Sequence, residues 1–203
     1  SRDRTGEILD GLAASLPGLR VIHQKNAGHG AAIRRGLEEA RGERCFLIDS
    51  DRQIPLACFG EAWRAAATAD CVFGIRRNRS DPALRLGLTR VIRVFVRAVF
   101  GTRIRDLNAP FKVFTRESWD AAAGLIPPGT LAPSLFLAII ADAQGRRIEQ
   151  IEVAHKERAT GVVSIRRWRL LRFCARAFVQ LVGLRWRLLW SRSGSAPRSA
   201  RAG

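Results

Sequence analysis

Short apolar runs alternate along this chain with segments long enough to form helices. The runs lie at 19–24, 44–49, 70–76 and 146–158, and we expect each to form a strand. From residue 105 onward a further strand and helix are expected. This alternation favours an α/β fold with a mostly parallel sheet flanked by helices. A chain of 203 residues with 47% hydrophobic content is large enough to bury the core of such a fold.

The chain is strongly basic. Its formal net charge is +17, and nearly all of the positive charge is arginine. Genomic base composition can explain arginine in place of lysine, but it does not explain the scarcity of Asp and Glu. The charge therefore predicts an anionic partner, namely nucleic acid, anionic lipid or a phosphorylated substrate. The four cysteines have no close spacing, which argues against a zinc site or a disulfide framework.

Two segments, 86–101 and 164–190, combine an apolar face with a stripe of arginines. Neither has the roughly 18 uninterrupted apolar residues that a membrane-spanning helix needs. Together with the flanking tryptophans, this pattern is typical of a helix that lies in a membrane interface. A core helix packed on the sheet and a subunit interface remain as alternatives. We expect a catalytic domain over 1–163, an amphipathic interfacial helix over 164–190 and a disordered basic tail over 191–203.

Two carboxylates follow the apolar run at 44–49 directly. Asp49 and Asp51 stand at its carboxyl end, which is where ligands bind in parallel α/β sheets. Two carboxylates in this position can hold a hard divalent cation that bridges to phosphate oxygens, and Gln53 can add an oxygen ligand. An ordinary acidic turn is the alternative interpretation.

The motifs around this pair resemble, in their order, those of family-2 glycosyltransferases with the GT-A (Rossmann-like) fold. That family has an Asn-x-Gly-x-Gly-x-Ala loop, a Gly-x-x-x-Ala-x-Gly helix end and a strand-terminal Asp-x-Asp. The matching positions are Asn26, Gly28, Gly30 and Ala32, then Gly36, Ala40 and Gly42, then Asp49 and Asp51. The resemblance implies that Asn26, Gly28, Gly30 and Asp49 bind the donor. It also puts the family's first strand before Ser1, so we expect that strand to be missing.

The likeness is sharper to the dolichyl-phosphate mannose synthase type, which carries Asp-x-Asp-x-Gln. The resemblance makes Asp49, Asp51 and Gln53 the ligands of Mg2+ or Mn2+, and it makes Asp51 and Asp106 the catalytic residues. Its later motifs give the residues that bind the acceptor phosphate as Arg76, Arg85, Thr89, Arg158 and Ser164. The chain departs from the pattern where Pro110 replaces the usual glycine and where one extra residue precedes Ser164. The resemblance extends from Ser1 to about Trp168.

The resemblance implies a metal-dependent inverting glycosyltransferase. Such an enzyme moves a hexose from a nucleotide sugar, GDP-mannose or a UDP-hexose, to a polyprenyl phosphate. The metal neutralises the departing diphosphate, and arginines hold the phosphates. A phosphate acceptor is ionised near neutral pH and needs no strong base. We expect a peripheral protein on the cytoplasmic face of the cell membrane, in contact with its anionic surface.

Three alternatives stay open. A family-2 transferase with a soluble saccharide acceptor needs a base, for which Asp106 is the candidate, although Asp106 could equally be a turn residue. A basic nucleic-acid-binding protein fits the charge, but the continuous apolar faces of the arginine-rich helices and the lack of a nucleic-acid-binding motif disfavour it. A chain without its first strand could also be inactive, because the nucleotide pocket would be half built.

Overall fold

The computed structural model describes residues 4–77, 83–127, 129–130, 132–156 and 167–194, except the side chains of 83–86, 167–171, 173–174 and 191–194. The elements in chain order are α1 (Thr5–Ser15), α2 (His29–Glu39), β1 (Arg44–Ile48), the 3-10 turn η1 (Leu56–Cys58), α3 (Phe59–Ala65), β2 (Cys71–Arg77), α4 (Ala83–Phe100), β3 (Phe111–Thr115), α5 (Arg116–Ala123), α6 (Pro133–Ala143), β4 (Ile148–Ala154) and α7 (Arg167–Gly194). The predicted α/β class is confirmed.

The four described strands form one mixed sheet in the order β1-β3-β2-β4. β2 and β4 pair in parallel, whereas β3 is antiparallel to both of its neighbours, β1 and β2. Strands β1, β2 and β4 therefore share one direction, as predicted, and β3 runs against them. Consequently β3 begins at the end of the sheet where β1 and β2 finish, so the segment before β3 lies at this end. The predicted site lies there too.

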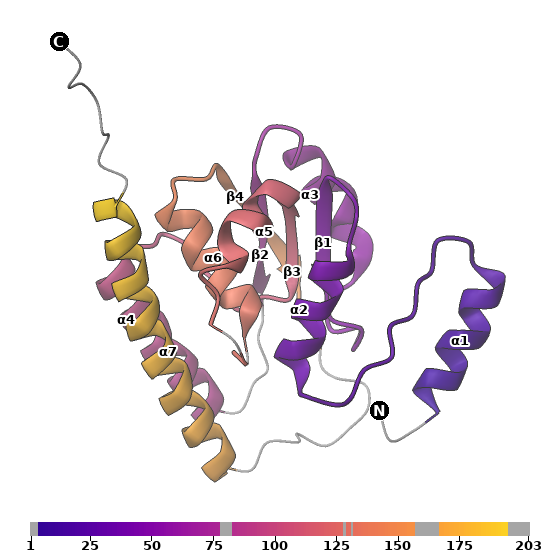
Figure 1. The fold of residues 1–203 in the computed structure, drawn as a ribbon, viewed down its shortest axis with the longest axis horizontal. Helices are drawn as coiled ribbons and strands as arrows, with labels where there is room; N and C mark the ends of the chain where they lie inside the picture. Colours follow the sequence, from indigo (N-terminus) through magenta and orange to yellow (C-terminus); the bar gives the residue numbers. More distant parts are fainter. Residues whose placement is uncertain (1–3, 78–82, 128, 131, 157–166, 195–203) are drawn as a thin grey trace.

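Apolar side chains cover both faces of the sheet. The larger core cluster includes Phe73 and Phe114 and packs against residues of α2, α4, α5, α6 and α7. The smaller cluster, with Val72 and Phe111, packs against α3. In Figure 1, α5 and α6 lie in front of the sheet, while α4 and α7 run side by side along one flank. The first four residues of β2 and of β3 are buried without alternation, because both faces of these strands are covered.

The strand expected at 19–24 is absent, and this prediction was wrong. The segment has no regular secondary structure, and Leu19 and Ile22 are exposed. A β-strand is stabilised by ladder hydrogen bonds, and this run joins none of the four described strands. Helix α1 before it has no buried residue and stands apart from the sheet (Figure 1). The segment is joined to the described helices through the polar contacts of Arg20 with Glu39 and of His23 with Asp10, and its apolar residues belong to neither core cluster.

Helix α7 has two different apolar faces. One face is core, because Leu181, Leu184 and Leu188 are buried in the larger cluster. The other is exposed and includes Trp186 and Trp190. The core-helix interpretation thus holds for one face, and the interfacial interpretation of the exposed face stays a prediction. The described part of the helix runs over Arg167–Gly194 and continues past the expected end at residue 190. The predicted tail lies outside the described residues from 195 onward.

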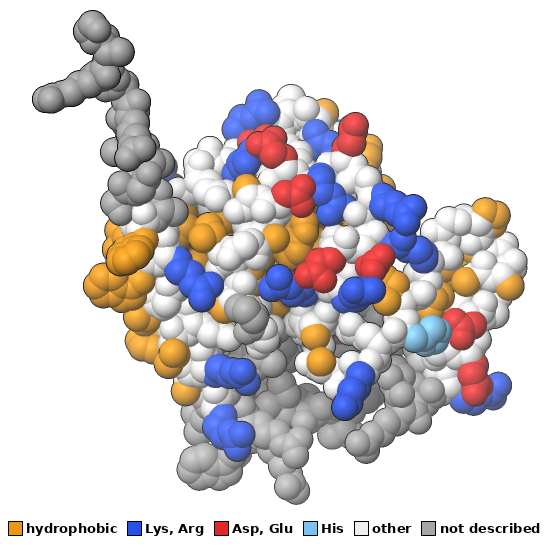
Figure 2. Space-filling view, in the orientation of Figure 1, with side chains coloured by type: hydrophobic (Ala, Val, Ile, Leu, Met, Phe, Trp, Pro, Cys, Tyr) orange, Lys and Arg blue, Asp and Glu red, His pale blue; other side chains and the backbone are white. Residues whose placement is uncertain are grey.

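Helices α4 and α7 pack through Phe95 and Phe178, whose ring centroids are 4.4 Å apart. Their outward sides carry apolar residues next to the arginines of both helices. The exposed apolar residues are Val91 and Val94 of α4 and Phe178, Val179, Val182, Trp186, Leu189 and Trp190 of α7, and we call this set the outer apolar ridge. Figure 2 shows hydrophobic surface gathered along this flank. In the part of the chain that the structure describes, no helix combines the length and apolar character needed to cross a bilayer.

Because Leu184 is fully buried, we expect Leu184→Ala to lower the free energy of unfolding by about 2–5 kcal/mol, through lost burial and the cavity left behind. Urea denaturation followed by circular dichroism measures this. Val179→Ala, on the exposed side of the same helix, is the matched control and should stay within about 0.5 kcal/mol of wild type. Equal effects of the two substitutions would contradict the two-faced packing of α7.

Candidate active site

The predicted donor loop forms a tight turn at the start of α2. The Asn26 side chain accepts a hydrogen bond from the Gly28 backbone N–H at 3.0 Å. Gly28 has φ +92°, a left-handed conformation that favours glycine. Gly30 is buried in the first turn of the helix. This geometry sets His29 at the helix start, beside the end of β1.

The Asp-x-Asp-x-Gln stretch leaves β1 as a constrained turn. The Gln53 backbone N–H donates to Oδ1 of Asp51 at 3.1 Å, and between these residues Arg52 has φ +59°. A non-glycine residue in this region is strained and persists only where its surroundings hold it. The backbone of Gln53 is held in turn, because its carbonyl accepts from the Lys156 N–H at 2.8 Å. The Asp51 carboxylate is thus held in the turn that follows β1.

The Asp49 carboxyl lies in a charged surrounding. Burial raises its pKa, and the negative charge of Asp51 raises it further. His29, Lys112 and Arg76 oppose these two effects, and Nε2 of His29 lies 3.6 Å from Oδ1 of Asp49. The donor loop, the aspartate pair and two cations of the neighbouring strands therefore meet at one place.

This donor set suits a hard divalent cation. The side chains of Asp49 and Asp51 offer carboxylate oxygens. Burial and, to a smaller extent, the charge of Asp51 raise the pKa of Asp49, and a cation bound between the two carboxylates would oppose both effects. The described residues contain no group of three His, Cys, Asp or Glu side chains that could hold a metal. A cation here would complete its shell with the amide oxygen of Gln53, water or oxygens of a bound diphosphate.

Arg76 and Asp106, which the sequence treats separately, form one buried ion pair. Nε of Arg76 donates to Oδ2 of Asp106 at 2.8 Å, and Nη2 donates to Oδ1 at 2.9 Å. Their side chains are only 6% and 10% exposed. The Arg76 backbone N–H also reaches Oδ2, at 3.3 Å. This two-pronged arrangement fixes the plane of the guanidinium group and does not use Nη1.

Gly74 allows the strands to approach closely just before Arg76. A Cβ at this position would lie 3.1 Å from both Phe111 Cβ and Val153 Cγ2, which belong to the neighbouring strands β3 and β4. Gly74, two residues before Arg76, therefore has a packing role. Arg76 follows at the end of β2, where strand alternation puts it on the same side as Gly74.

Lys112 is buried completely in the middle of the sheet. It pairs in register with Leu47 of β1 and Phe73 of β2. Its Nζ donates to the backbone carbonyls of Leu107 at 3.1 Å and Ala109 at 2.5 Å, and lies 5.5 Å from the Phe73 ring centroid. Burial lowers the pKa of Lys112 to about 7, against the opposing charge of Asp106. Lys112 thus fixes the segment that carries Asp106.

The remaining acceptor residues from the sequence are described only in part. Thr89 lies half-buried in α4. Arg85 belongs to the same helix, but its side chain lies outside the described residues. Arg158 and Ser164 lie outside them altogether. Of the acceptor residues whose side chains the structure describes, Arg76 is joined to the residues around Asp49.

Sequence reasoning gave no role to His29, Lys112 or Gln150. For Lys112 a signal did exist, because one lysine inside the apolar run FKVF is costly to bury unless it has partners. Gln150 carries no such signal, since a polar residue on an alternating strand is usually solvated.

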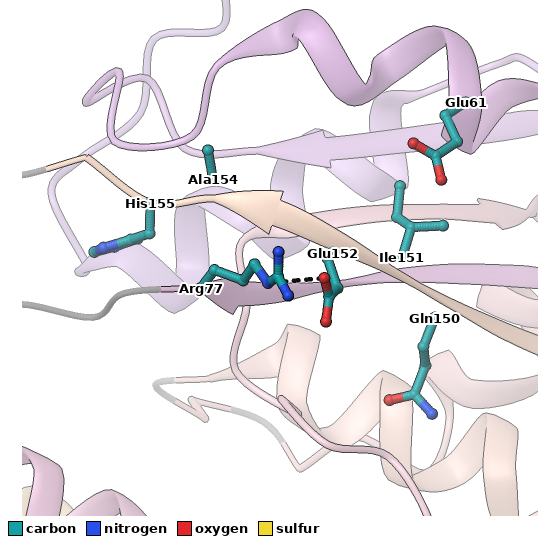
Figure 3. A pocket seen from close by; sticks show the side chains of 7 residues that line it. All are labelled: Glu61, Arg77, Gln150, Ile151, Glu152, Ala154 and His155. Atoms are coloured by element: carbon teal, nitrogen blue, oxygen red, sulfur yellow. Dashed lines mark ion pairs between the residues drawn. The ribbon is translucent and has the colours of Figure 1, made fainter.

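A hollow of about 620 Å³ lies beside the group, along β4 (Figure 3). Arg77 and Glu152 line it side by side and pair at 2.8 Å. Gln150 points to the opposite side of the strand from Ile151 and Glu61. Two of its three charged lining residues, Arg77 and Glu152, pair with each other, and Glu61 is the third.

Comparison with known proteins gives a consistent result. Residues 1–120 match the sequence model of Glycosyl transferase family 2. Undecaprenyl-phosphate 4-deoxy-4-formamido-L-arabinose transferase of Pseudomonas paraeruginosa is 33% identical over 175 residues, which cover 84% of this chain and 50% of that protein. The protein of the same name from Pseudomonas fluorescens Pf0-1 is 31% identical over 167 residues, covering 79% and 47%. The chain thus spans about half the length of these curated relatives.

Solved structures share the fold. Mannosyl-3-phosphoglycerate synthase from Rubrobacter xylanophilus superposes with a TM-score of 0.63 at 19% identity, covering 98% of this chain and 63% of that one. Glucosyl-3-phosphoglycerate synthase from Mycobacterium tuberculosis, in complex with Mn2+ and uridine-diphosphate-glucose, gives 0.57 at 18% identity, covering 91% and 64%. At these identities the likeness concerns the fold alone.

The depressed pKa of Lys112 predicts a pH-dependent stability. Between about pH 7 and the ordinary lysine pKa, the unfolded chain holds a proton that the folded protein has lost, so stability rises with pH. Above pH 9, Cys71 makes stability fall with pH. Burial raises its pKa to about 11, so the folded protein keeps a proton that the unfolded chain loses. Urea denaturation from pH 7 to 9 should therefore show a gain of up to about 1 kcal/mol per pH unit.

Lys112→Met is the matched variant for this measurement, because it keeps the length of the side chain and removes the titrating group. Its stability should be nearly flat over the same pH range. An equal slope in Lys112→Met and wild type would show that other groups cause the dependence. Cys71 is one neighbour of the ammonium that could contribute, because burial raises its pKa.

Proposed function

The chain belongs to glycosyl transferase family 2, and we propose that it transfers a sugar from a nucleotide sugar to a polyprenyl phosphate at a membrane surface. The observation that carries this proposal is the meeting of two anion-handling groups at one sheet edge. One is the Asp49–Asp51 pair, suited to a metal-bound diphosphate, and the other is the Arg76–Asp106 pair, suited to a second phosphate. The relatives named as undecaprenyl-phosphate transferases support the acceptor class.

On the donor side, Asp49 and Asp51 would hold Mg2+ or Mn2+, with Gln53 as a further oxygen ligand. The bound cation would neutralise charge on the departing nucleoside diphosphate. The glucosyl-3-phosphoglycerate synthase solved with Mn2+ and uridine-diphosphate-glucose supports a divalent metal in this fold. Asn26, Gly28 and Gly30 would line the donor from the turn before α2, where backbone N–H groups at a helix start favour anions.

On the acceptor side, Asp106 orients the Arg76 guanidinium, and the Nη1 edge of Arg76 contacts the acceptor phosphate. A phosphate oxygen then attacks the anomeric carbon, the bond to the diphosphate oxygen breaks, and the configuration inverts. The attacking oxygen is already ionised, so the step requires no strong base. The buried pairing of Asp106 with Arg76 favours this role over that of a base for a saccharide hydroxyl. Arg85, Thr89, Arg158 and Ser164 are proposed to complete the phosphate site.

The outer apolar ridge of α4 and α7 is proposed to rest on the cytoplasmic face of the membrane, where a polyprenyl phosphate would present its headgroup. Arginines beside the ridge, among them Arg93 and Arg176, would meet anionic lipid headgroups. The exposed tryptophans Trp186 and Trp190 suit the interface, because an indole has an apolar body and one N–H donor.

The activity is tested by following transfer of labelled sugar to undecaprenyl phosphate. The donors are GDP-mannose, UDP-glucose and a nucleotide-activated 4-deoxy-4-formamido-L-arabinose. Asp51→Ala should lower kcat/KM by a factor of about 100 or more, because the developing negative charge loses its metal. Asp120→Ala, an exposed aspartate on α5, is the control and should leave the rate unchanged. Full activity of Asp51→Ala, or of the wild-type protein in excess EDTA, would refute the metal role.

Membrane binding is tested by cosedimentation with vesicles that contain anionic phospholipid. The double substitution Trp186→Ala, Trp190→Ala should weaken binding by a factor of about 10 or more, through loss of apolar contact. Trp63→Ala provides a matched control, because Trp63 is an exposed tryptophan on α3, which covers the other side of the sheet. If Trp63→Ala weakens binding as much as the double substitution, the ridge is not the membrane-binding surface.

A further inference from the structure

The segment 103–109 joins α4 to β3 without helix or strand, yet much of it is buried. Ile104, Leu107 and Ala109 have almost no exposed surface. A buried backbone outside regular structure must find partners for its N–H and C=O groups, because an unpaired group there costs free energy. The side chains that supply these partners therefore determine where the segment lies, and with it Asp106.

Three neighbouring strands each contribute one side chain that holds this segment. Arg76 from β2 binds Asp106 itself. Lys112 from β3 donates to the carbonyls of Leu107 and Ala109. Gln150 from β4 holds the beginning of the segment, with its Oε1 accepting from the Arg105 N–H at 2.8 Å and its Nε2 donating to the Arg103 carbonyl at 3.5 Å.

Gln150 and Lys112 lie in one row across the sheet. Phe73 of β2 pairs with Lys112 on one side and with Gln150 on the other. Side chains opposite each other on neighbouring strands point to the same face of the sheet. The side chains of Lys112 and Gln150 therefore reach the segment 103–109 from the same face. In Figure 3 the Gln150 amide is turned away from Ile151, toward the loop below the strand. The amide oxygen accepts a hydrogen bond from the loop backbone and the amide nitrogen donates one to it, so both polar atoms of the glutamine side chain are used.

We propose that Gln150 is a positioning residue for the acceptor phosphate, because its amide fixes the backbone of 103–105 and thereby fixes Asp106, which orients Arg76. This inference rests on the proposed function for its kinetic consequence, and on geometry alone for the holding of the segment. Gln150 itself contacts no reacting atom. Its loss would let Asp106 move, and the Arg76 guanidinium would lose its fixed plane.

Gln150→Leu tests the inference, with Gln150→Glu as the conservative variant. Leucine has a similar size but offers no polar atom, whereas glutamate still accepts from the Arg105 N–H. For Gln150→Leu, hydrogen exchange read by mass spectrometry should show amides of 102–108 exchanging about tenfold faster. The KM for undecaprenyl phosphate should rise about tenfold, and the KM for the nucleotide sugar should stay within about twofold. Gln150→Glu should restore both values to near wild type.

Glu149→Gln, the exposed neighbour on the same strand, is the control and should behave as wild type in every measurement. Unchanged exchange at 102–108 in Gln150→Leu would overturn the inference, whatever the activity. A rise of both KM values together with a lower melting temperature would also overturn it, because that is the signature of a merely structural role. If wild-type protein transfers nothing to polyprenyl phosphate, the proposed function fails, and exchange alone then decides whether Gln150 holds the segment.

Discussion

The buried ion pair of Arg76 and Asp106 is the interaction on which the site depends. Two charges at 6% and 10% exposure are stable only as partners, since either alone would be a buried unpaired charge. The pair joins the end of β2 to the segment before β3, positions 30 residues apart. It also converts a flexible arginine into a group with a fixed plane, which is what recognition of a phosphate requires.

The reversed direction of β3 makes this pairing possible. Because β3 runs against β1 and β2, the chain reaches its first residue at the edge where those two strands end. Asp106 therefore arrives beside Asp49 and Arg76 without a long loop. The same reversal buries the approach segment, so that Lys112 must satisfy two of its carbonyls. A lysine in the centre of a sheet, otherwise unfavourable, has here a definite structural use.

The sequence allowed much of the fold to be predicted. Strands β1, β2 and β4 were predicted from apolar runs. Asp49 and Asp51 were expected at the end of a strand, because they follow one of these runs. The direction of β3 could not be predicted, since a strand has the same side-chain period in either direction. The strand expected at 19–24 failed for a related reason, because its apolar pattern does not specify whether a partner strand is present.

The site could be predicted as a set of residues but not as a set of contacts. Motif order brought Arg76 and Asp106 to attention, yet it assigned them separate roles, because spacing along the chain does not reveal that they pair. No role could be predicted for Gln150 from the sequence. Its function would lie in hydrogen bonds to the backbone of 103–105, and backbone partners leave no trace in the residue types at those positions.

Helix α4 links the two halves of the proposed function. It ends at Phe100, and the chain then enters the segment that carries Asp106, so the α4 part of the outer apolar ridge and Asp106 are about ten residues apart along one continuous stretch. Helix α7 holds α4 from the side through Phe95 and Phe178, while its own leucines enter the core. A membrane surface that contacts the ridge would therefore contact a part of the folded core. The acceptor headgroup and Arg76 would then meet in an orientation that the fold itself sets.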